Sequence, residues 1–236
     1  MTVPPPPWRR TARKRAPKQV LSQDLIVRTA LKILGKEGID AVTMRRVAQE
    51  LETGPASLYA HVTNKEELDE LMLDAVLAGM PRPEPDPKRW TEQVKDLVRH
   101  QVQAMMAYPG IARVAWNIPV PVNPSTLHQG ESMLALLRAG GLDLKQATFA
   151  GDALWLYAKA YAYEGSSWTW GDYDAEKVSE RGKQMQEYMR SLPPEMFPNM
   201  LRIGEFFGAE TAAERFDFAL DIFLAGIRTL ASRDKN

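Results

Sequence analysis

Cysteine is absent from the 236-residue chain, which excludes disulfide bonds, thiol nucleophiles and thiolate metal sites. Long apolar runs are absent as well: none approaches the roughly 18 residues needed to cross a bilayer, and the N-terminus has no apolar signal-peptide region. We therefore expect a soluble, cytoplasmic protein that has no membrane partner.

The sequence patterns of common enzyme sites are also missing. There is no G-x-x-x-x-G-K phosphate loop, no G-x-S-x-G elbow, no H-E-x-x-H helix and no G-x-G-x-x-G turn. Only three histidines are present in the whole chain. The sequence therefore predicts neither an enzyme nor a bound cofactor.

Positive and negative charges balance over the whole chain but not along it. Residues 1–65 hold 12 Lys and Arg against 5 Asp and Glu, whereas residues 66–236 hold 18 against 25. A basic first part on an acidic body is the distribution that phosphate binding by one end requires. Double-stranded DNA is the partner that this asymmetry favours.

The positive charge is densest in the first 20 residues. The segment W-R-R-T-A-R-K-R-A-P-K carries six positive charges and no acid, and it cannot bury enough apolar surface to fold alone. We predict a disordered basic arm over residues 1–20. Two roles stay open: a solubilising tail, or binding along phosphates or in an A·T-rich minor groove. In the second role, the residues expected to contact DNA are Arg9, Arg10, Arg13, Lys14 and Arg15.

Residues 42–65, V-T-M-R-R-V-A-Q-E-L-E-T-G-P-A-S-L-Y-A-H-V-T-N-K, contain two short helical patterns. The spacing predicts helices over 43–51 and 55–62. Their apolar face consists of Val47, Leu51, Leu58 and Val62. Thr43 can cap the first helix, and Pro55 suits the first turn of the second. Two short helices joined by a tight turn predict a helix-turn-helix, whose second helix can enter the major groove of DNA.

Two further helices complete a predicted DNA-binding domain over residues 21–80. One begins near Ser22 and stops at Gly38. The other starts at Asn64, which forms a capping-box pattern with Glu67, and leads toward the rest of the chain.

The remainder of the chain has a helical pattern after a short break. Residues 81–87, P-R-P-E-P-D-P, lack apolar side chains and break helical structure, so we expect an extended linker there. Residues 88–236 show no strand pattern. The expected helices cover 90–108, 111–117, 125–139, 143–164, 176–191 and 209–231, with a short turn of helix around 199–206. The sequence therefore predicts an all-α protein with an N-terminal three-helix helix-turn-helix domain and a C-terminal helical domain.

The patterns V-T-M-R-R-V-A-Q-E-L and S-L-Y-A-H-V-T-N-K-E-E-L resemble the DNA-binding domain of the tetracycline-repressor (TetR) family of bacterial transcription regulators. The core L-Y-x-H-V-x-N-K, residues 58–65, is highly specific. The chain departs from the family at the turn, where Glu52 replaces a frequent Gly and Thr53 replaces an apolar residue. We expect Gly54 to take over the turn.

The resemblance also implies where DNA is bound. It places Arg45 on a phosphate or a base edge and Lys65 on a phosphate. It implies a recognition surface that contains Pro55, Ser57, Tyr59 and His61. Positions that contact bases in the family are held here by Ala56 and Ala60, whose methyl groups suit a thymine methyl. Thr43, at the start of the first motif helix, is counted with this surface.

The body resembles, more loosely, the C-terminal domain of the tetracycline repressor in Trp90, the loop reaching Pro119, L-L-R-A-G-G-L-D-L and A-G-D-A-L-W-L-Y-A-K-A-Y-A-Y-E. This resemblance implies a ligand-binding and dimerisation domain, in which the long helix ending near Glu164 and the final helix form a two-fold four-helix bundle. An apolar stripe on the final helix has two interpretations, chain core or dimer seam, and the resemblance favours the seam. It consists of Phe216, Leu220, Phe223, Leu224 and Ile227.

Aromatic and methionine side chains in the body predict a ligand cavity. Together they would line a mostly apolar site with a few polar groups, as drug-sized sites are lined, although each one alone favours structural packing. The predicted set is His100, Met105, Trp116, Asn117, Trp155, Tyr157, Tyr161, Trp168 and Trp170.

The energy of switching bounds the size of the ligand. To change the ratio of DNA-bound to released protein from 99:1 to 1:99, the ligand must bind the released state about 5.5 kcal/mol more favourably than the DNA-bound state. Burying about 200 Å² of apolar ligand surface yields about 5 kcal/mol of binding free energy in all. Only the part of this energy that differs between the DNA-bound and the released state of the protein contributes to switching. We therefore expect a bulky apolar or aromatic small-molecule effector with several rings.

No metal site is predicted. In the tetracycline repressor a histidine near the short helix binds the drug-chelated magnesium, and Val114 stands at the matching position here. Glu164 matches an acidic residue that helps to hold that metal, but one oxygen ligand without its imidazole partner is weak support. Tetracycline–magnesium is therefore not the expected ligand.

The sequence thus predicts a homodimeric DNA-binding regulator that leaves its operator when a small molecule enters the body. Its expected role is repression of an efflux, resistance or biosynthetic gene. The alternative is a DNA-binding regulator with a vestigial pocket, controlled by a protein partner or not controlled by a ligand.

Overall fold

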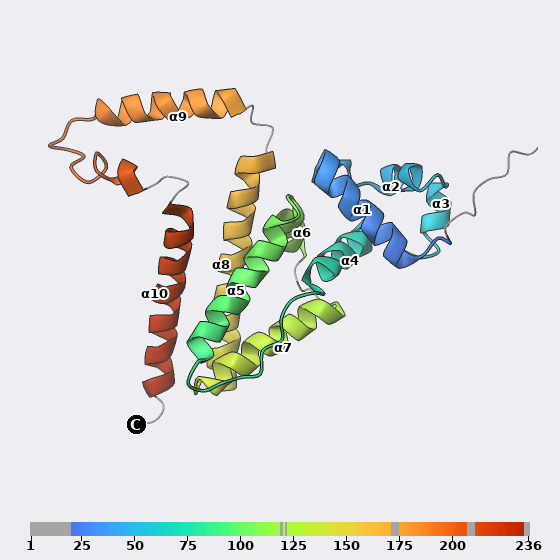
Figure 1. The fold of residues 1–236 in the computed structure, drawn as a ribbon, viewed down its shortest axis with the longest axis horizontal. Helices are drawn as coiled ribbons and strands as arrows, with labels where there is room; N and C mark the ends of the chain where they lie inside the picture. Colours follow the sequence, from blue (N-terminus) through green and yellow to red (C-terminus); the bar gives the residue numbers. More distant parts are fainter. Residues whose placement is uncertain (1–19, 119, 121, 171–174, 207–210, 234–236) are drawn as a thin grey trace, which may run out of the picture.

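The computed structural model describes residues 20–118, 120, 122–170, 175–206 and 211–233. Within these ranges the chain forms ten α-helices and two short 3-10 helices, and no strand is present there (Figure 1). The predicted all-α class is confirmed.

The first group of helices forms the predicted DNA-binding domain. Its elements are α1 (Gln23–Glu37), η1 (Ile39–Ala41), α2 (Met44–Glu50), α3 (Pro55–Leu58) and α4 (Lys65–Leu77). The first turns are fixed by the predicted caps: Thr43 Oγ1 accepts from the backbone N–H of Arg46 at 3.1 Å, and Asn64 Oδ1 accepts from that of Glu67 at 2.8 Å. The core between α1, α2, α3 and α4 is fully buried and contains Ile26, Leu34, Val47, Leu58 and Leu68.

The second motif helix is shorter than its predicted span of 55–62. It ends at Leu58, whose carbonyl accepts from the N–H groups of both His61 and Val62 at 2.9 Å. Asn64 must be extended, at φ −158° and ψ −175°, to cap α4. The chain therefore has to leave the helical conformation before it reaches this cap.

The turn between α2 and α3 is a Schellman motif centred on Glu52, not on Gly54 as expected. Glu52 has φ +50°, whereas Gly54 has φ −82°. The Thr53 N–H donates to the Ala48 carbonyl at 2.9 Å, and the Glu52 N–H donates to the Gln49 carbonyl at 3.1 Å. This pair of bonds requires a left-handed residue directly after the end of the helix. The glutamate therefore occupies the position that glycine often holds in the family.

Replacing Glu52 with Gly is expected to stabilise the protein by about 1 kcal/mol, because a side chain in the left-handed region costs about 1–2 kcal/mol. The melting temperature should rise by about 2–4 °C. Thr53→Gly is the matched control, since Thr53 is not among the described residues with positive φ. An unchanged melting temperature for Glu52→Gly would contradict the strained turn.

The body consists of the later helices. They are α5 (Trp90–Met106), α6 (Ile111–Asn117), α7 (Pro124–Ala139), α8 (Leu144–Trp170), α9 (Ala175–Arg190), η2 (Ile203–Phe206) and α10 (Ala212–Arg233). Residues 80–86 have no regular secondary structure. The start of α8 carries a reciprocal cap, with Asp143 Oδ1 accepting from Gln146 N–H at 2.7 Å and Gln146 Oε1 accepting from Asp143 N–H at 3.1 Å. At its other end α8 continues past Glu164 to Trp170.

Helix α8 is the centre of the body. It packs against α5, α6, α7 and α10, while α4 packs against α6 and α7 and so joins the DNA-binding domain to the body. In Figure 1, α10 stands beside α8, and α9 lies crosswise above this pair. Among the described residues, no helix is long and apolar enough to cross a membrane.

The predicted stripe on α10 belongs to the core of its own chain. Phe216 is buried, and its ring lies 5.5 Å from that of Tyr157 and 4.5 Å from that of Tyr161, both on α8. The interpretation of this stripe as a dimer seam is therefore wrong. The large apolar side chains that α10 exposes are Phe218, Ile222 and Leu230.

Candidate DNA-binding surface and ligand cavity

Helix α3 and the turn after it are buried on one side and open on the other. Leu58 and Val62 are buried in the domain core. The opposite side exposes Pro55, Ala56, Ser57, Tyr59 and Ala60. With 53% of its surface exposed, Tyr59 is the largest side chain of this face. The predicted recognition residues thus share one solvent-facing surface, except for the half-buried His61.

The position of this surface is fixed by α1. Gln23, the first residue of α1, donates from Nε2 to the carbonyl of His61 at 3.2 Å. Because this bond joins the start of α1 to the end of the α3 turn, it holds the turn in place without using a side chain of the exposed face.

Two adjacent arginines on α2 have different roles. Arg46 donates to Glu37 at 2.6 and 3.0 Å and to Glu50 at 3.0 Å, which ties α2 to the end of α1. These bonds raise the pKa of Arg46 and lower the pKa of Glu37; hydrogen bonds from Lys32 and then Arg46 lower the pKa of Glu50. Arg45 is exposed and has no ion-pair partner in the described part of the chain. Arg45 is therefore the one of the two that is available to DNA.

The other predicted DNA-binding residues are either engaged in contacts within the protein or lie outside the described residues. Lys65 forms an ion pair with Asp69 one turn further along α4, so contact with a phosphate requires it to leave this carboxylate. Thr43 is exposed, but its hydroxyl caps α2. The arm residues Arg9, Arg10, Arg13, Lys14 and Arg15 lie outside the described residues.

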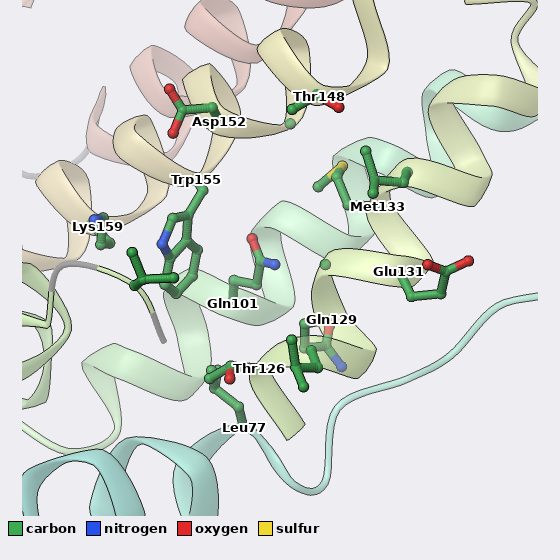
Figure 2. Close-up of a pocket in the computed structure, with 15 residues that line it drawn as sticks. Leu77, Gln101, Thr126, Gln129, Glu131, Met133, Thr148, Asp152, Trp155 and Lys159 are labelled. Atoms are coloured by element: carbon green, nitrogen blue, oxygen red, sulfur yellow. The ribbon is translucent and has the colours of Figure 1, made fainter. Parts of the chain in front are cut away.

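A cavity of about 490 Å³ lies between α4, α5, α7 and α8 (Figure 2). It is lined by Leu77, Gln101, Val120, Thr126, Leu127, Gln129, Gly130, Glu131, Met133, Leu134, Thr148, Gly151, Asp152, Trp155 and Lys159. A volume of this size falls within the range of drug-sized ligand sites. In Figure 2 the indole of Trp155 points from α8 toward Gln101 of α5, whereas Asp152 on the same helix points away from Gln101.

The cavity wall contains one half-buried cation. The Nζ atom of Lys159 lies 5.5 Å from the ring centre of Trp116 and 5.6 Å from that of Trp155. Burial lowers the pKa of Lys159, with the charge of Asp152 acting in the opposite direction. No carboxylate in the described part of the chain forms an ion pair with this ammonium group.

Of the predicted ligand residues, Trp155 lines this cavity. Tyr157 and Tyr161 instead turn toward α10, where their hydroxyls donate to the carbonyls of Phe216 at 3.4 Å and Ala212 at 3.0 Å. Burial raises the pKa of Tyr157 to about 12 and also raises the pKa of Tyr161. These two tyrosines join α8 to α10.

The remaining predicted ligand residues are not brought together in the cavity. Met105 is fully buried in the core. His100 is exposed and donates from Nδ1 to the Asp96 carbonyl at 2.6 Å. Trp116 and Asn117, at the end of α6, are exposed. The side chains of Trp168 and Trp170 lie outside what the structure describes.

Sequence reasoning missed the polar residues of the cavity, including Gln101, Gln129 and Lys159. Gln101 had a recognisable signal, because it interrupts the buried apolar stripe Val94, Leu97, Val98, Val102 and Met105 of α5. A polar residue on the buried face of an amphipathic helix indicates a polar function there.

Besides the packing of α4 against α6 and α7, specific contacts join the body to the DNA-binding domain. Asp74 Oδ1 on α4 accepts from the backbone N–H of Ser125 in the first turn of α7 at 2.7 Å, and Leu77, one turn further along α4, lines the cavity. Arg113 on α6 forms an ion pair with Asp40 in η1 at 3.1 Å. Gly110, at φ +94°, precedes α6, and a Cβ there would lie 3.1 Å from Ile39.

Among the described residues, no group of three His, Cys, Asp or Glu side chains is arranged to hold a metal ion. Val114, at the position of the family's metal-binding histidine, is buried, and Glu164 is exposed.

The fold and these two sites define a helix-turn-helix DNA-binding protein whose DNA-binding domain borders a ligand-sized cavity. The model of bacterial regulatory proteins of the tetR family matches residues 26–70, and the tetracyclin repressor-like C-terminal domain matches residues 82–231. The chain belongs to the tetracycline-repressor (TetR) family and is a DNA-binding transcription regulator.

Relatives of known structure cover nearly the whole chain. Apo ActR from Streptomyces coelicolor is 41% identical, with a TM-score of 0.81 over 91% of this chain and 98% of ActR. ActR in complex with actinorhodin is 42% identical, with a TM-score of 0.80 over 88% of this chain and 95% of that one. The transcriptional repressor DrrR1 of Streptomyces coeruleorubidus is 35% identical over 133 residues, which are 54% of this chain and 47% of DrrR1.

Proposed function

We propose that the protein is a repressor that binds operator DNA as a two-fold dimer and releases it when a small aromatic molecule enters the cavity between α4, α5, α7 and α8. The observation that carries this proposal is the shared helix α4. Its Leu77 lines the cavity and its Asp74 holds α7, while its N-terminus follows directly on the recognition turn. A ligand that favours another position of α4 therefore favours another position of α3.

The similarity to ActR and DrrR1 supports ligand-controlled repression. ActR has been solved with actinorhodin and with (S)-DNPA, and DrrR1 is named a repressor. The size of the cavity and its Trp155 wall favour a bulky aromatic effector for this chain as well. A vestigial pocket is disfavoured because two buried amide oxygens in its wall have no hydrogen-bond donor in the described part of the chain.

Exposed apolar side chains on α8 and α10 support dimerisation. Phe149, Leu156 and Tyr163 follow one another at intervals of seven residues along α8, so they lie on one face of that helix. On α10, Phe218, Ile222 and Leu230 form a second exposed stripe. Exposed large apolar side chains that gather on one face of a helix indicate an interaction site. Pairing both stripes with those of a second copy gives a four-helix interface.

The test is selection of binding sites from a random DNA duplex library by the full-length protein. Two related half-sites roughly 34–36 Å apart, or a multiple of this spacing, are expected, because a two-fold dimer presents its recognition helices to successive major grooves. Adding an effector should release the selected duplex, and a sedimentation mass of twice the monomer should accompany binding. Recovery of no common sequence would exclude a specific operator, and retention of DNA by the effector-saturated protein would exclude release.

The proposed role is regulation without catalysis. Candidate effectors incubated with the purified protein should be recovered chemically unchanged, as mass spectrometry can establish. A new product formed in proportion to protein concentration would contradict this.

Deleting residues 1–18 is expected to flatten the salt dependence of operator binding. This segment contains six Lys and Arg and no Asp or Glu. The slope of log affinity against log salt should fall by about 0.9 for each lost phosphate contact, because each contact releases condensed counterions. Titration of full-length and truncated protein at several salt concentrations measures the slope. An unchanged slope would make the arm a solubilising tail.

A further inference from the structure

Two side-chain amide oxygens are buried in the cavity wall without a hydrogen-bond partner in the described part of the chain. Gln101 of α5 is 4% exposed and Gln129 of α7 is 5% exposed, and neither side-chain oxygen has a donor in the described part of the chain. A buried amide oxygen without a donor has lost its hydrogen bonds to water and gained none in return, which destabilises the fold. An apolar residue at either position would pack without this cost. Both oxygens are therefore placed to accept hydrogen bonds from a molecule in the cavity.

Lys159 adds a positive charge to the same wall. Its ammonium group lies over the rings of Trp116 and Trp155, where burial lowers the pKa of Lys159 and no carboxylate in the described part of the chain forms an ion pair with it. An anionic group of a ligand beside Nζ would stabilise the charged form of Lys159, and a flat ring attached to this group would lie against the indole of Trp155.

The acidic residues of the wall do not reverse this preference. Glu131 and Asp152 are both exposed to solvent, whereas Lys159 is half-buried. Water and salt screen charges at exposed positions much more than charges that are partly buried. Asp152 also points away from Gln101 in Figure 2. The lining of the cavity therefore includes one half-buried cation and two buried amide oxygens that can accept hydrogen bonds.

We propose that the effector is a fused-ring aromatic carboxylic acid that also carries hydroxyl or N–H groups. Its carboxylate pairs with Lys159, its ring system lies against Trp155, and its donors bind the side-chain oxygens of Gln101 and Gln129. This inference rests on the proposed function and names the class of ligand that the cavity takes.

The test is calorimetric titration of the full-length protein, without DNA, using 6-hydroxy-2-naphthoate and its uncharged methyl ester. The acid is expected to bind at least about tenfold more tightly than the ester, which is about 1.4 kcal/mol. Lys159→Gln should remove this preference by weakening the acid alone, and Lys159→Arg should retain it. The matched control is Lys145→Gln on the same helix, because Lys145 also lies over a ring, 5.8 Å from that of Phe149, but outside the cavity wall.

The two amides are tested with 2-naphthoate, which lacks the hydroxyl group. It should bind several-fold more weakly than the hydroxylated acid in the wild type, and equally in the Gln101→Leu/Gln129→Leu double variant. Thermal denaturation of each variant establishes that it is folded.

The inference would be overturned if the ester bound as tightly as the acid, or if the acid did not bind up to its solubility limit. It would also be overturned if folded Lys159→Gln kept the wild-type preference for the acid over the ester. A cationic aminoethyl amide of the same ring system that binds better than the acid would overturn it as well. Because these titrations contain no DNA, their failure is distinct from failure of the proposed function, which would appear as loss of operator selection or of release.

Discussion

Tyr59→Ala is expected to weaken operator binding by about a hundredfold. A hydrogen bond to a charged group such as a phosphate contributes about 1.5–3 kcal/mol, and a dimer loses two of them, one in each half-site. A total of about 3 kcal/mol corresponds to a factor of more than 100 in affinity. The fold should not change, because Tyr59 is 53% exposed and makes no side-chain contact on which the core of the domain depends. Fluorescence anisotropy with the selected duplex measures the effect.

Tyr188→Ala is the matched control, since Tyr188 is an exposed tyrosine on α9. Its operator affinity should equal that of the wild type. Lys65→Ala should also weaken binding, but less than Tyr59→Ala, because Lys65 has to leave Asp69 before it can contact a phosphate. Wild-type affinity in both Tyr59→Ala and Lys65→Ala would exclude the proposed recognition surface.

Trp155→Ala is expected to raise the effector concentration needed for half-release of DNA by roughly fiftyfold to a hundredfold. Removing contact with about 100 Å² of indole surface costs about 2.5 kcal/mol at roughly 25 cal/mol per Å². Trp155 lies in the cavity wall and not on the DNA-binding surface, so operator affinity without effector should stay within a few-fold of wild type. A titration of the preformed protein–DNA complex with the effector gives the half-release concentration.

Trp116→Ala provides the contrasting variant. Trp116 contacts Lys159 but is exposed and does not line the cavity, so its loss should change the half-release concentration only a few-fold. If Trp155→Ala still released DNA at the wild-type effector concentration, Trp155 would not be part of the ligand site.

The fold was predictable where its determinants are local. Thr43, Asn64 and Asp143 each form the cap that their sequence context predicts, and each fixes the start of a helix within a residue. Such bonds span three residues, so neighbouring sequence letters are enough to identify them. The turn at Glu52 was not predictable in this way, because the side-chain cost of its left-handed backbone is overcome by the packing of α2 and α3 around it.

The ligand cavity was only partly predictable, because composition does not tell which helix an aromatic residue faces. Tyr157 and Trp155 are two residues apart on α8, yet one faces α10 and the other the cavity. Residues two apart on a helix point in different directions, and the side that each one meets depends on where α5, α7 and α10 are placed. The position of Lys159 between two indoles likewise depends on the packing of α6 against α8.

The bond between Asp74 and the backbone N–H of Ser125 has a consequence for how such a regulator can diversify. Its donor is a main-chain group, so any residue except proline at position 125 preserves it. The side chains of Thr126, Leu127 and Gln129, which line the cavity, can then be replaced without breaking the connection to α4. Related proteins can therefore acquire new effectors by substitutions along α7, while the hydrogen bond that connects α7 to α4 and so to the DNA-binding domain is kept.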